Sequence, residues 1–235
     1  MIPFRDNVPS RGYPIITVLI IVANITVFLY QFFLPSEALD RFLFEYGVVP
    51  AKLQLIGQHP VQVTTGLGVS VLASMFLHGG LFHLVGNMWY LWIFGDNIED
   101  RMGSIRFFFF YFLCGILATW THILFNLDSQ IPTIGASGAV SGVLGAYLVS
   151  YPFARVLTMV PLFFIWPVIE LPAILVLGSW FFIQLLNGTA SLGETSQLMS
   201  GVAWWAHIGG FISGTALIGM FARRPVRRYH WGRTG

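Results

Sequence analysis

The sequence predicts an all-α fold: a polytopic membrane protein with a bundle of six transmembrane helices and a large outer loop after the first helix. Three observations support this prediction. Hydrophobic residues make up 56% of the 235 residues and charged residues only 9%, a composition outside the range of soluble domains. Six apolar runs are separated by polar turns. Positive charges gather in alternate connections, which is typical of a chain that crosses a membrane repeatedly.

The predicted spans belong to one domain of residues 13–222. They cover residues 13–34, 81–98, 105–125, 137–151, 169–186 and 203–221. The first run is too long for a signal peptide and has no small-residue cleavage site, so we expect it to be retained. The fourth run is short and rich in glycine, which favours a position in the middle of the bundle. A proline-rich stretch precedes the fifth run and leaves its start open.

Residues 35–80 form the predicted outer loop. They mix charged and apolar residues at helical spacing, for example in residues 38–46, which indicates short helices lying at the membrane interface. None of these stretches is a plausible span. Residues 1–12 and the basic residues 223–235 are predicted to be cytoplasmic tails.

The lysine and arginine residues support both the number of spans and their orientation. With six spans, both termini share one side with the connections after spans two and four. That side carries ten of the twelve: Arg5, Arg11, Arg101, Arg106, Arg155 and five arginines after residue 222. Only Arg41 and Lys52 lie opposite. The positive-inside rule therefore places the termini in the cytoplasm. The small extramembrane content and the lack of a targeting presequence favour a prokaryotic inner membrane.

The composition also limits the chemistry. The single cysteine, Cys114, lies within an apolar run, so no intrachain disulfide is expected and no metal-ligand spacing is present. A net charge of +2 does not imply a nucleic acid partner. We expect neither a metal nor a cofactor, and we expect membrane lipid to surround the chain.

A serine between glycines begins the fourth span, at Gly135-Ala136-Ser137-Gly138. One interpretation is that Ser137 only eases helix packing. A serine becomes a nucleophile when a base takes its proton, and His207 lies about one turn into the sixth span. In the predicted orientation both side chains lie near the outer surface. A polar residue at that depth is costly in lipid unless it faces protein or a hydrated cavity, which makes it a functional candidate.

Glycines on both helices allow the close approach that such a pair requires. Gly210 and Gly214 follow His207 by three and seven residues, on its own helical face. The fourth span carries glycines at Gly138, Gly142 and Gly145.

Hydrogen-bond donors for an oxyanion are also present. His83 and Asn87 lie four residues apart at the start of the second span, hence on one helical face and at the same predicted depth. The backbone N–H of Ser137, at a helix N-terminus, is a third donor. The alternative is that His83 and Asn87 only cap the end of a span.

Taken together, these motifs resemble those of the rhomboid family of intramembrane serine proteases. The resemblance extends over essentially all of the chain and rests on Gly135-Ala136-Ser137-Gly138, on Ala206-His207-Ile208-Gly209-Gly210 through Gly214, and on His83 to Asn87. It implies a catalytic dyad, with Ser137 as nucleophile and His207 as general base. It also implies an oxyanion hole formed by His83, Asn87 and the Ser137 N–H.

The resemblance has further implications and one departure. Glu99, Arg101 and Gly103 resemble the polar turn after the second span, which is structural in the family. By resemblance, residues 187–201 cap the active-site cavity, and the fifth span moves aside to admit a substrate helix. Some members carry an aromatic residue one turn after the serine, packed on the histidine ring, whereas this chain has Ser141.

We therefore expect an intramembrane serine endopeptidase that acts on transmembrane protein substrates. No acidic residue lies near His207 in the sixth span, and Glu170 belongs to the cytoplasmic end of the fifth, so a triad is disfavoured. His78 is expected to belong to a structural hydrogen-bond network in the outer loop, with contact to substrate as the alternative. His122 and His59 are expected to be structural or interfacial, and His230 lies in the basic tail. The alternatives are a catalytically silent relative that binds membrane helices and a small transporter. The sequence defines neither the natural substrate nor the oligomeric state.

Overall fold

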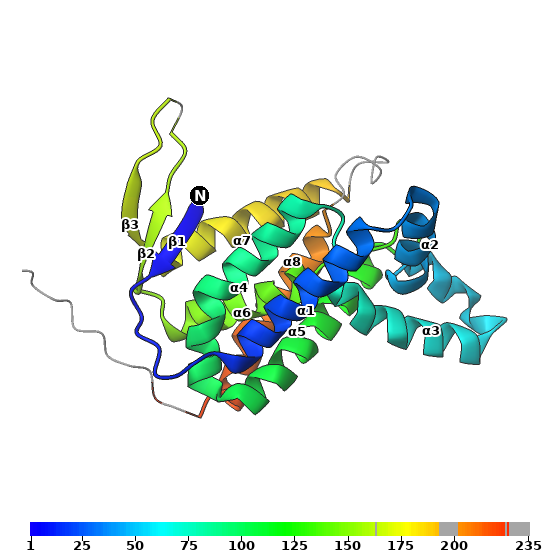
Figure 1. Ribbon diagram of the computed structural model, residues 1–235, viewed down its shortest axis with the longest axis horizontal. Coiled ribbons are helices and arrows are strands. Elements are labelled where there is room, and N and C mark those ends of the chain that lie inside the picture. Colours follow the sequence, from blue (N-terminus) through cyan, green and yellow to red (C-terminus); the bar gives the residue numbers. More distant parts are fainter. Residues whose placement is uncertain (163, 193–201, 224, 226–235) are drawn as a thin grey trace, which may run out of the picture.

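The structure is a computed structural model and describes residues 1–162, 164–192, 202–223 and 225. Its central body is a bundle of the helices α1 (Ile15–Phe32), α4 (Leu81–Met102), α5 (Ser104–Phe125), α6 (Ser137–Ser150), α7 (Ala173–Ala190) and α8 (Trp204–Phe221) (Figure 1). Every residue of α6 from Gly138 to Tyr147 is buried, and the helix lies among α4, α5, α7 and α8. The short, glycine-rich segment is therefore central, as its composition predicted.

The segment between α1 and α4 forms short helices at one end of the bundle. They are α2 (Ser36–Tyr46), the 3₁₀-helix η1 (Pro50–Gly57), α3 (Pro60–Ala73) and the 3₁₀-helix η2 (Ser74–Phe76). They lie opposite the end that carries the β-sheet (Figure 1). Short helices were predicted here, but no span was. Residues Pro60–Phe76, which comprise α3 and η2, are apolar enough to form one broken span with α4, from which they are bent by 81°.

The protein is an integral membrane protein. Among the described residues, α1, α5 and α7 are each long and apolar enough to cross a membrane alone. Helix α6 has 14 residues, fewer than the roughly 20 that usually span a bilayer. Of the described helices, α8 has 18 residues including His207 and several glycines, and it is not among those long and apolar enough to count as a span alone. That the chain crosses the membrane six times therefore stays a prediction.

The prediction of an all-α fold missed a small antiparallel sheet. Strands β1 (Ile2–Asp6), β2 (Arg155–Met159) and β3 (Val168–Pro172) pair in the order β1-β2-β3. The sheet brings the N-terminus onto a hairpin about 150 residues further along the chain, a pairing that local periodicity does not reveal. Residues 1–12 are therefore not simply a tail.

The same sheet corrects the fifth predicted span. The expected start at residue 169 lies inside β3, and α7 begins only at Ala173 and ends at Ala190. Pro172 precedes the first helical residue, where its fixed φ and missing N–H are tolerated. Apart from Glu170, apolar residues and prolines run through β3 and directly into α7, so composition did not mark the boundary.

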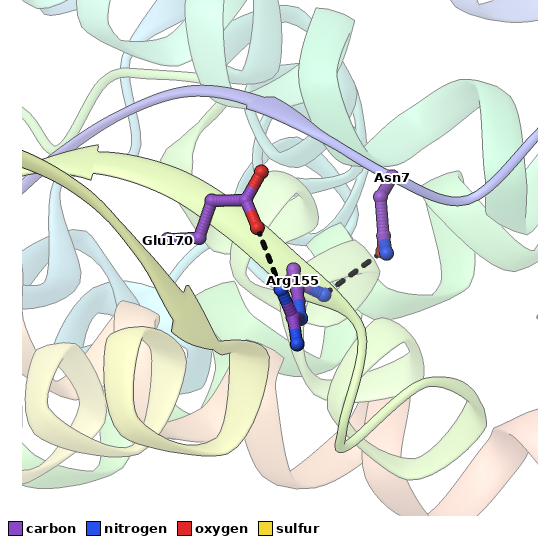
Figure 2. Close-up of polar contacts among 3 residues, drawn as sticks. All are labelled: Asn7, Arg155 and Glu170. Atoms are coloured by element: carbon purple, nitrogen blue, oxygen red, sulfur yellow. Dashed lines mark hydrogen bonds and ion pairs between the residues drawn. The ribbon is translucent and has the colours of Figure 1, made fainter. Parts of the chain in front are cut away.

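Polar contacts join the N-terminal strand to the hairpin (Figure 2). The Arg155 backbone N–H donates to Asn7 Oδ1 at 2.9 Å, and the Asn7 N–H donates to the Arg155 carbonyl at 3.0 Å. The Arg155 guanidinium pairs with Glu170 Oε2 across the strands at 3.1 Å. Both of these side chains are about half exposed, so this ion pair contributes at most about 1 kcal/mol.

Several segments meet at the sheet end of the bundle. The Arg223 N–H donates to the Arg101 carbonyl, and Arg106 Nη1 donates to the Phe221 carbonyl. One end of the bundle thus holds the N-terminus, the turn between α4 and α5, the hairpin and the end of α8, as six spans require. Whether this end faces the cytoplasm stays a prediction, and residues 224 and 226–235 of the basic tail lie outside the described residues.

Glu99 joins three helices near this end. Its side chain is 3% exposed, and it accepts hydrogen bonds from Ile16 N, Thr17 N, Thr17 Oγ1 and Ser104 Oγ at 2.6 to 3.0 Å. The first N–H groups of α1 have no partner within their own helix, and a carboxylate satisfies them while interacting favourably with the helix dipole. This arrangement fits the structural role that the family resemblance implied for Glu99.

Helices α6 and α8 run parallel with their backbones in direct contact. A Cβ atom on Gly210 would overlap the Gly138 carbonyl, and one on Gly214 would overlap the Gly142 carbonyl. Only glycine fits at these positions. The predicted small-residue faces of the fourth and sixth spans therefore do meet.

Adding one methyl group to this contact is expected to destabilise the fold. Gly214→Ala must push α8 away from α6, and overpacking of this kind costs about 1–3 kcal/mol or more. Gly219→Ala is the matched control, because a Cβ at Gly219 on the same helix meets nothing within 4 Å. Thermal unfolding of both variants in detergent micelles measures the difference. Equal midpoints would contradict the contact.

Asp6 at the end of β1 lies in a polar cluster with α4 and α6. Its Oδ2 accepts hydrogen bonds from Asn97 Nδ2 at 2.9 Å and from the Tyr147 hydroxyl. Burial, with a smaller contribution from the Asp96 carboxylate, raises the pKa of Asp6 from 3.8 to about 7. The hydrogen bond from Tyr147 opposes this rise without cancelling it.

The raised pKa of Asp6 predicts a pH dependence of stability. Between pH 3.8 and about 7 the folded protein retains a proton that the unfolded chain releases, so the free energy of unfolding falls as the pH rises through this window. Asp6→Asn removes the titrating group and should flatten the dependence. Unfolding of both proteins from about pH 5 to about pH 8 tests this. If the free energy of unfolding declined equally with pH in the wild type and in Asp6→Asn, the effect would belong to another titrating group.

Candidate active site

Ser137 is the first residue of α6 and follows a turn that only glycine suits. Gly135 has a φ of +128°, and its N–H donates to the Ser74 carbonyl at 2.8 Å, which holds the turn against η2. The Ser137 N–H lies in the first turn of α6, where backbone donors have no partner within the helix. The backbone carbonyl of Ser137 accepts a 2.6 Å hydrogen bond from Ser141 Oγ.

The ring of His83 approaches this turn from α4. A Cβ atom built on Gly135 would lie 2.9 Å from His83 Nε2 and 3.5 Å from Ser137 Oγ. The imidazole and the hydroxyl therefore border the same small space. Any side chain at Gly135 would fill this space in addition to straining the backbone.

His207 lies in the first turn of α8, at the level of Ser137. A Cβ on Gly138 would be 3.7 Å from the Ala206 carbonyl, so the residue after Ser137 faces the residue before His207. Because α6 and α8 are parallel and in contact, the hydroxyl and the imidazole lie at the same end of two touching helices. The structure thus brings together the two elements on which the prediction of a dyad depends.

Asn87 lies one turn after His83 on the same face of α4. Its side chain is 8% exposed, and its Nδ2 atom has no hydrogen-bond partner within the described part of the chain. A buried amide donor without a partner carries a desolvation cost of about 1–3 kcal/mol. Such a donor is chemically suited to a bound acceptor, for example a carbonyl or an oxyanion.

The remaining histidines differ in their surroundings. His78 is held through its backbone, which forms two hydrogen bonds with the side-chain amide of Gln31, and its ring lies 5.1 Å from that of His83. His122 Nε2 lies 2.9 Å from Thr133 Oγ1, which indicates a structural role. His59 is exposed at the start of α3.

One polar contact of His207 was not predicted from the sequence. Gln184 on α7 lies with its Oε1 atom 2.8 Å from His207 Nδ1. The available signal was a lone glutamine in an apolar membrane-spanning run, since polar residues in such runs need a partner. Residues 193–201, most of the predicted cap over the cavity, lie outside the described residues.

Comparison with known proteins decides the family. The family model for the Rhomboid domain matches residues 66–224, which contain Ser137, His207, His83 and Asn87. The chain belongs to the rhomboid family. Members of the rhomboid family are typically intramembrane serine proteases.

Several curated rhomboid proteins are similar to this chain. Rhomboid protein 1, mitochondrial, of Saccharomyces cerevisiae is 31% identical over 68% of this chain and 43% of its own length. RHOMBOID-like protein 1 of Arabidopsis thaliana is 28% identical over 92% of this chain and 56% of its own length. The chain thus spans about half the length of these relatives. Both are eukaryotic, so they lend no support to the predicted prokaryotic membrane.

The close approach at Gly135 predicts a sharp difference between two glycine variants of this rhomboid protein. Gly135→Ala adds a methyl group against His83 at a strained φ and should cost about 1–3 kcal/mol of stability. It should also displace the NMR signals of the His83 ring. Gly86→Ala on α4 is the control, because its Cβ meets nothing within 4 Å. Similar unfolding midpoints and unchanged His83 signals in both variants would contradict the described turn.

Proposed function

We propose that this protein is an intramembrane serine endopeptidase that cleaves peptide bonds in or next to transmembrane segments of other membrane proteins. In this proposal Ser137 is the nucleophile and His207 is the general base. The observation that carries the proposal is the direct contact between the first turns of α6 and α8, where Gly138 faces Ala206. A base must reach within roughly 3 Å of the proton that it removes, and this contact makes such a distance accessible.

The proposed reaction proceeds through an acyl-enzyme. Ser137 Oγ attacks the carbonyl carbon of the scissile bond while His207 Nε2 takes the hydroxyl proton. The tetrahedral intermediate collapses, the C–N bond breaks, and His207 gives its proton to the leaving amine. A water molecule then attacks the acyl ester while His207 takes one of its protons. The bond between the acyl carbon and Ser137 Oγ breaks, His207 returns the proton to Ser137 Oγ, and the second product leaves with a new carboxyl group.

Three donors are available for the oxyanion that forms in this reaction. They are the Ser137 N–H, the Asn87 Nδ2, which has no partner among the described residues, and the His83 ring beside Gly135. Donors that are already oriented stabilise the developing charge without reorganisation, which is why they contribute strongly in a site shielded from water. The Asn87 amide supports this assignment best, because it is buried and has no other partner among the described residues.

The proposed orientation follows the distribution of arginine residues. The termini and the β-sheet would face the cytoplasm or an equivalent compartment, and the end that carries Ser137 would open to the opposite side. The substrates would be transmembrane proteins that reach the site through the lipid.

Cleavage of a reporter membrane helix by the purified protein tests the proposal. Ser137→Ala and His207→Ala should each lower the rate by at least about 10³-fold, because the residues act as a unit. Ser150→Ala, at the other end of α6, is the matched serine control and should retain activity. Thermal unfolding establishes that all three variants fold. Equal amounts of product from the wild type and Ser137→Ala would refute the proposal of a serine protease. The remaining alternatives would be a catalytically silent relative and a transporter.

A further inference from the structure

We propose that Gln184 is the positioning residue of His207, selecting the tautomer and the ring orientation that a general base requires. This inference rests on the proposed function of His207. It concerns a residue on α7, outside the motifs in α4, α6 and α8. The contact that carries it is the 2.8 Å approach of Gln184 Oε1 to His207 Nδ1.

The second hydrogen bond of Gln184 decides which amide atom faces the imidazole. Gln184 Nε2 donates to the Trp180 carbonyl at 3.1 Å, one turn earlier on α7. A carbonyl only accepts hydrogen bonds, so the amide nitrogen must point toward Trp180 and the amide oxygen toward His207. An amide oxygen also only accepts, and Nδ1 must therefore carry the proton.

The consequence for His207 is a defined neutral tautomer. With Nδ1 protonated, Nε2 has a free lone pair and is able to take the proton of the Ser137 hydroxyl. When Nε2 gains this proton, the Nδ1–H bond to Gln184 becomes charge-assisted and strengthens. The amide thus supports the imidazolium state without itself gaining or losing a proton.

The surroundings of Gln184 show that this contact is built into the packing. Gln184 is 5% exposed, whereas Phe182, Ile183 and Leu186 on the same helix are more than half exposed. A buried amide is costly unless both ends are hydrogen-bonded, and both are bonded here. Gly188, one turn later, permits the approach of α7 to α8, since a Cβ there would lie 2.8 Å from Ile208 Cδ1.

Helix α7 also supplies the aromatic neighbour that α6 lacks. The Trp180 ring lies 5.8 Å from the His207 ring with an angle of 35° between their planes. Ser141, at the position where some family members have an aromatic residue, is 1% exposed and turns its hydroxyl back to the Ser137 carbonyl. The imidazole is therefore held from α7 through Gln184 and Trp180.

Two substitutions of equal length separate the hydrogen bond from simple packing. Gln184→Met keeps the unbranched shape and removes the acceptor, and it should lower kcat on the order of 10-fold to 100-fold with KM changed less than about 3-fold. Gln184→Glu keeps an acceptor in either protonation state and should recover most of that loss. Packing alone predicts the opposite order, because methionine suits a buried apolar helix better than glutamate. Wild-type kcat in Gln184→Met, or no recovery in Gln184→Glu, would overturn the proposal.

A spectroscopic measurement decides the assignment independently of catalysis. In Ser137→Ala protein with ¹⁵N-labelled histidine, the His207 ring should be in the Nδ1–H form, and adding Gln184→Met should shift it toward the other tautomer. Loss of the signal in His207→Asn assigns it among the six histidines. Gln31→Met, which removes another buried glutamine, is the control and should leave the signal unchanged.

These readouts separate the two proposals. If no cleavage depends on Ser137, the proposed protease function is wrong. The NMR signal still decides whether Gln184 selects the tautomer of His207. The same tautomer with glutamine and with methionine at position 184 would overturn the positioning role even in an active enzyme.

Discussion

The backbone contact between α6 and α8 is the constraint on which the rest of the structure depends. Helices with ordinary side chains pack with their axes about 8–10 Å apart, and a glycine seam allows a closer approach. Inside a membrane the hydrophobic effect does not draw helices together, so such close van der Waals contact is a main source of association. The same contact brings a serine and a histidine from distant parts of the chain to one end of the bundle, where α4 and α7 add further polar groups.

Polar side chains connect the other helices to this pair. Glu99 binds the start of α1 and reaches α5, Gln31 ties the end of α1 to the backbone before α4, and Gln184 ties α7 to α8. Each of these side chains is buried, where an unsatisfied polar group would be expensive, so each contact specifies how two helices are placed. The bundle therefore combines non-specific apolar packing with a few directional contacts.

The ring of His207 can be held in place by residues from different helices. In some family members the aromatic ring that supports the histidine is on the helix of the serine, whereas this chain has Ser141 at that position on α6. The hydrogen bond from Gln184 and the ring contact with Trp180 come instead from α7, and Trp204 on α8 itself lies 6.2 Å from the imidazole, edge-on. Helix α7 directly follows strand β3, which pairs with β2, and β2 pairs with the N-terminal strand β1. Movement of α7 by more than the length of a hydrogen bond would release His207. The orientation of the imidazole is thus linked to the packing of a helix that has an exposed, apolar outer face.

Local features of the sequence determined the positions of most helices, the central place of α6 and the four candidate residues Ser137, His207, His83 and Asn87. Apolar length and glycine spacing act within a single segment, so the sequence alone reveals them. Only the tertiary structure showed that a β-sheet forms, where α7 begins and which residue is hydrogen-bonded to His207. The sheet depends on pairing between segments about 150 residues apart, and the Gln184 contact depends on the rotation of α7 against α8. Periodicity defines the faces of one helix, but the angle at which two helices meet is a property of their packing.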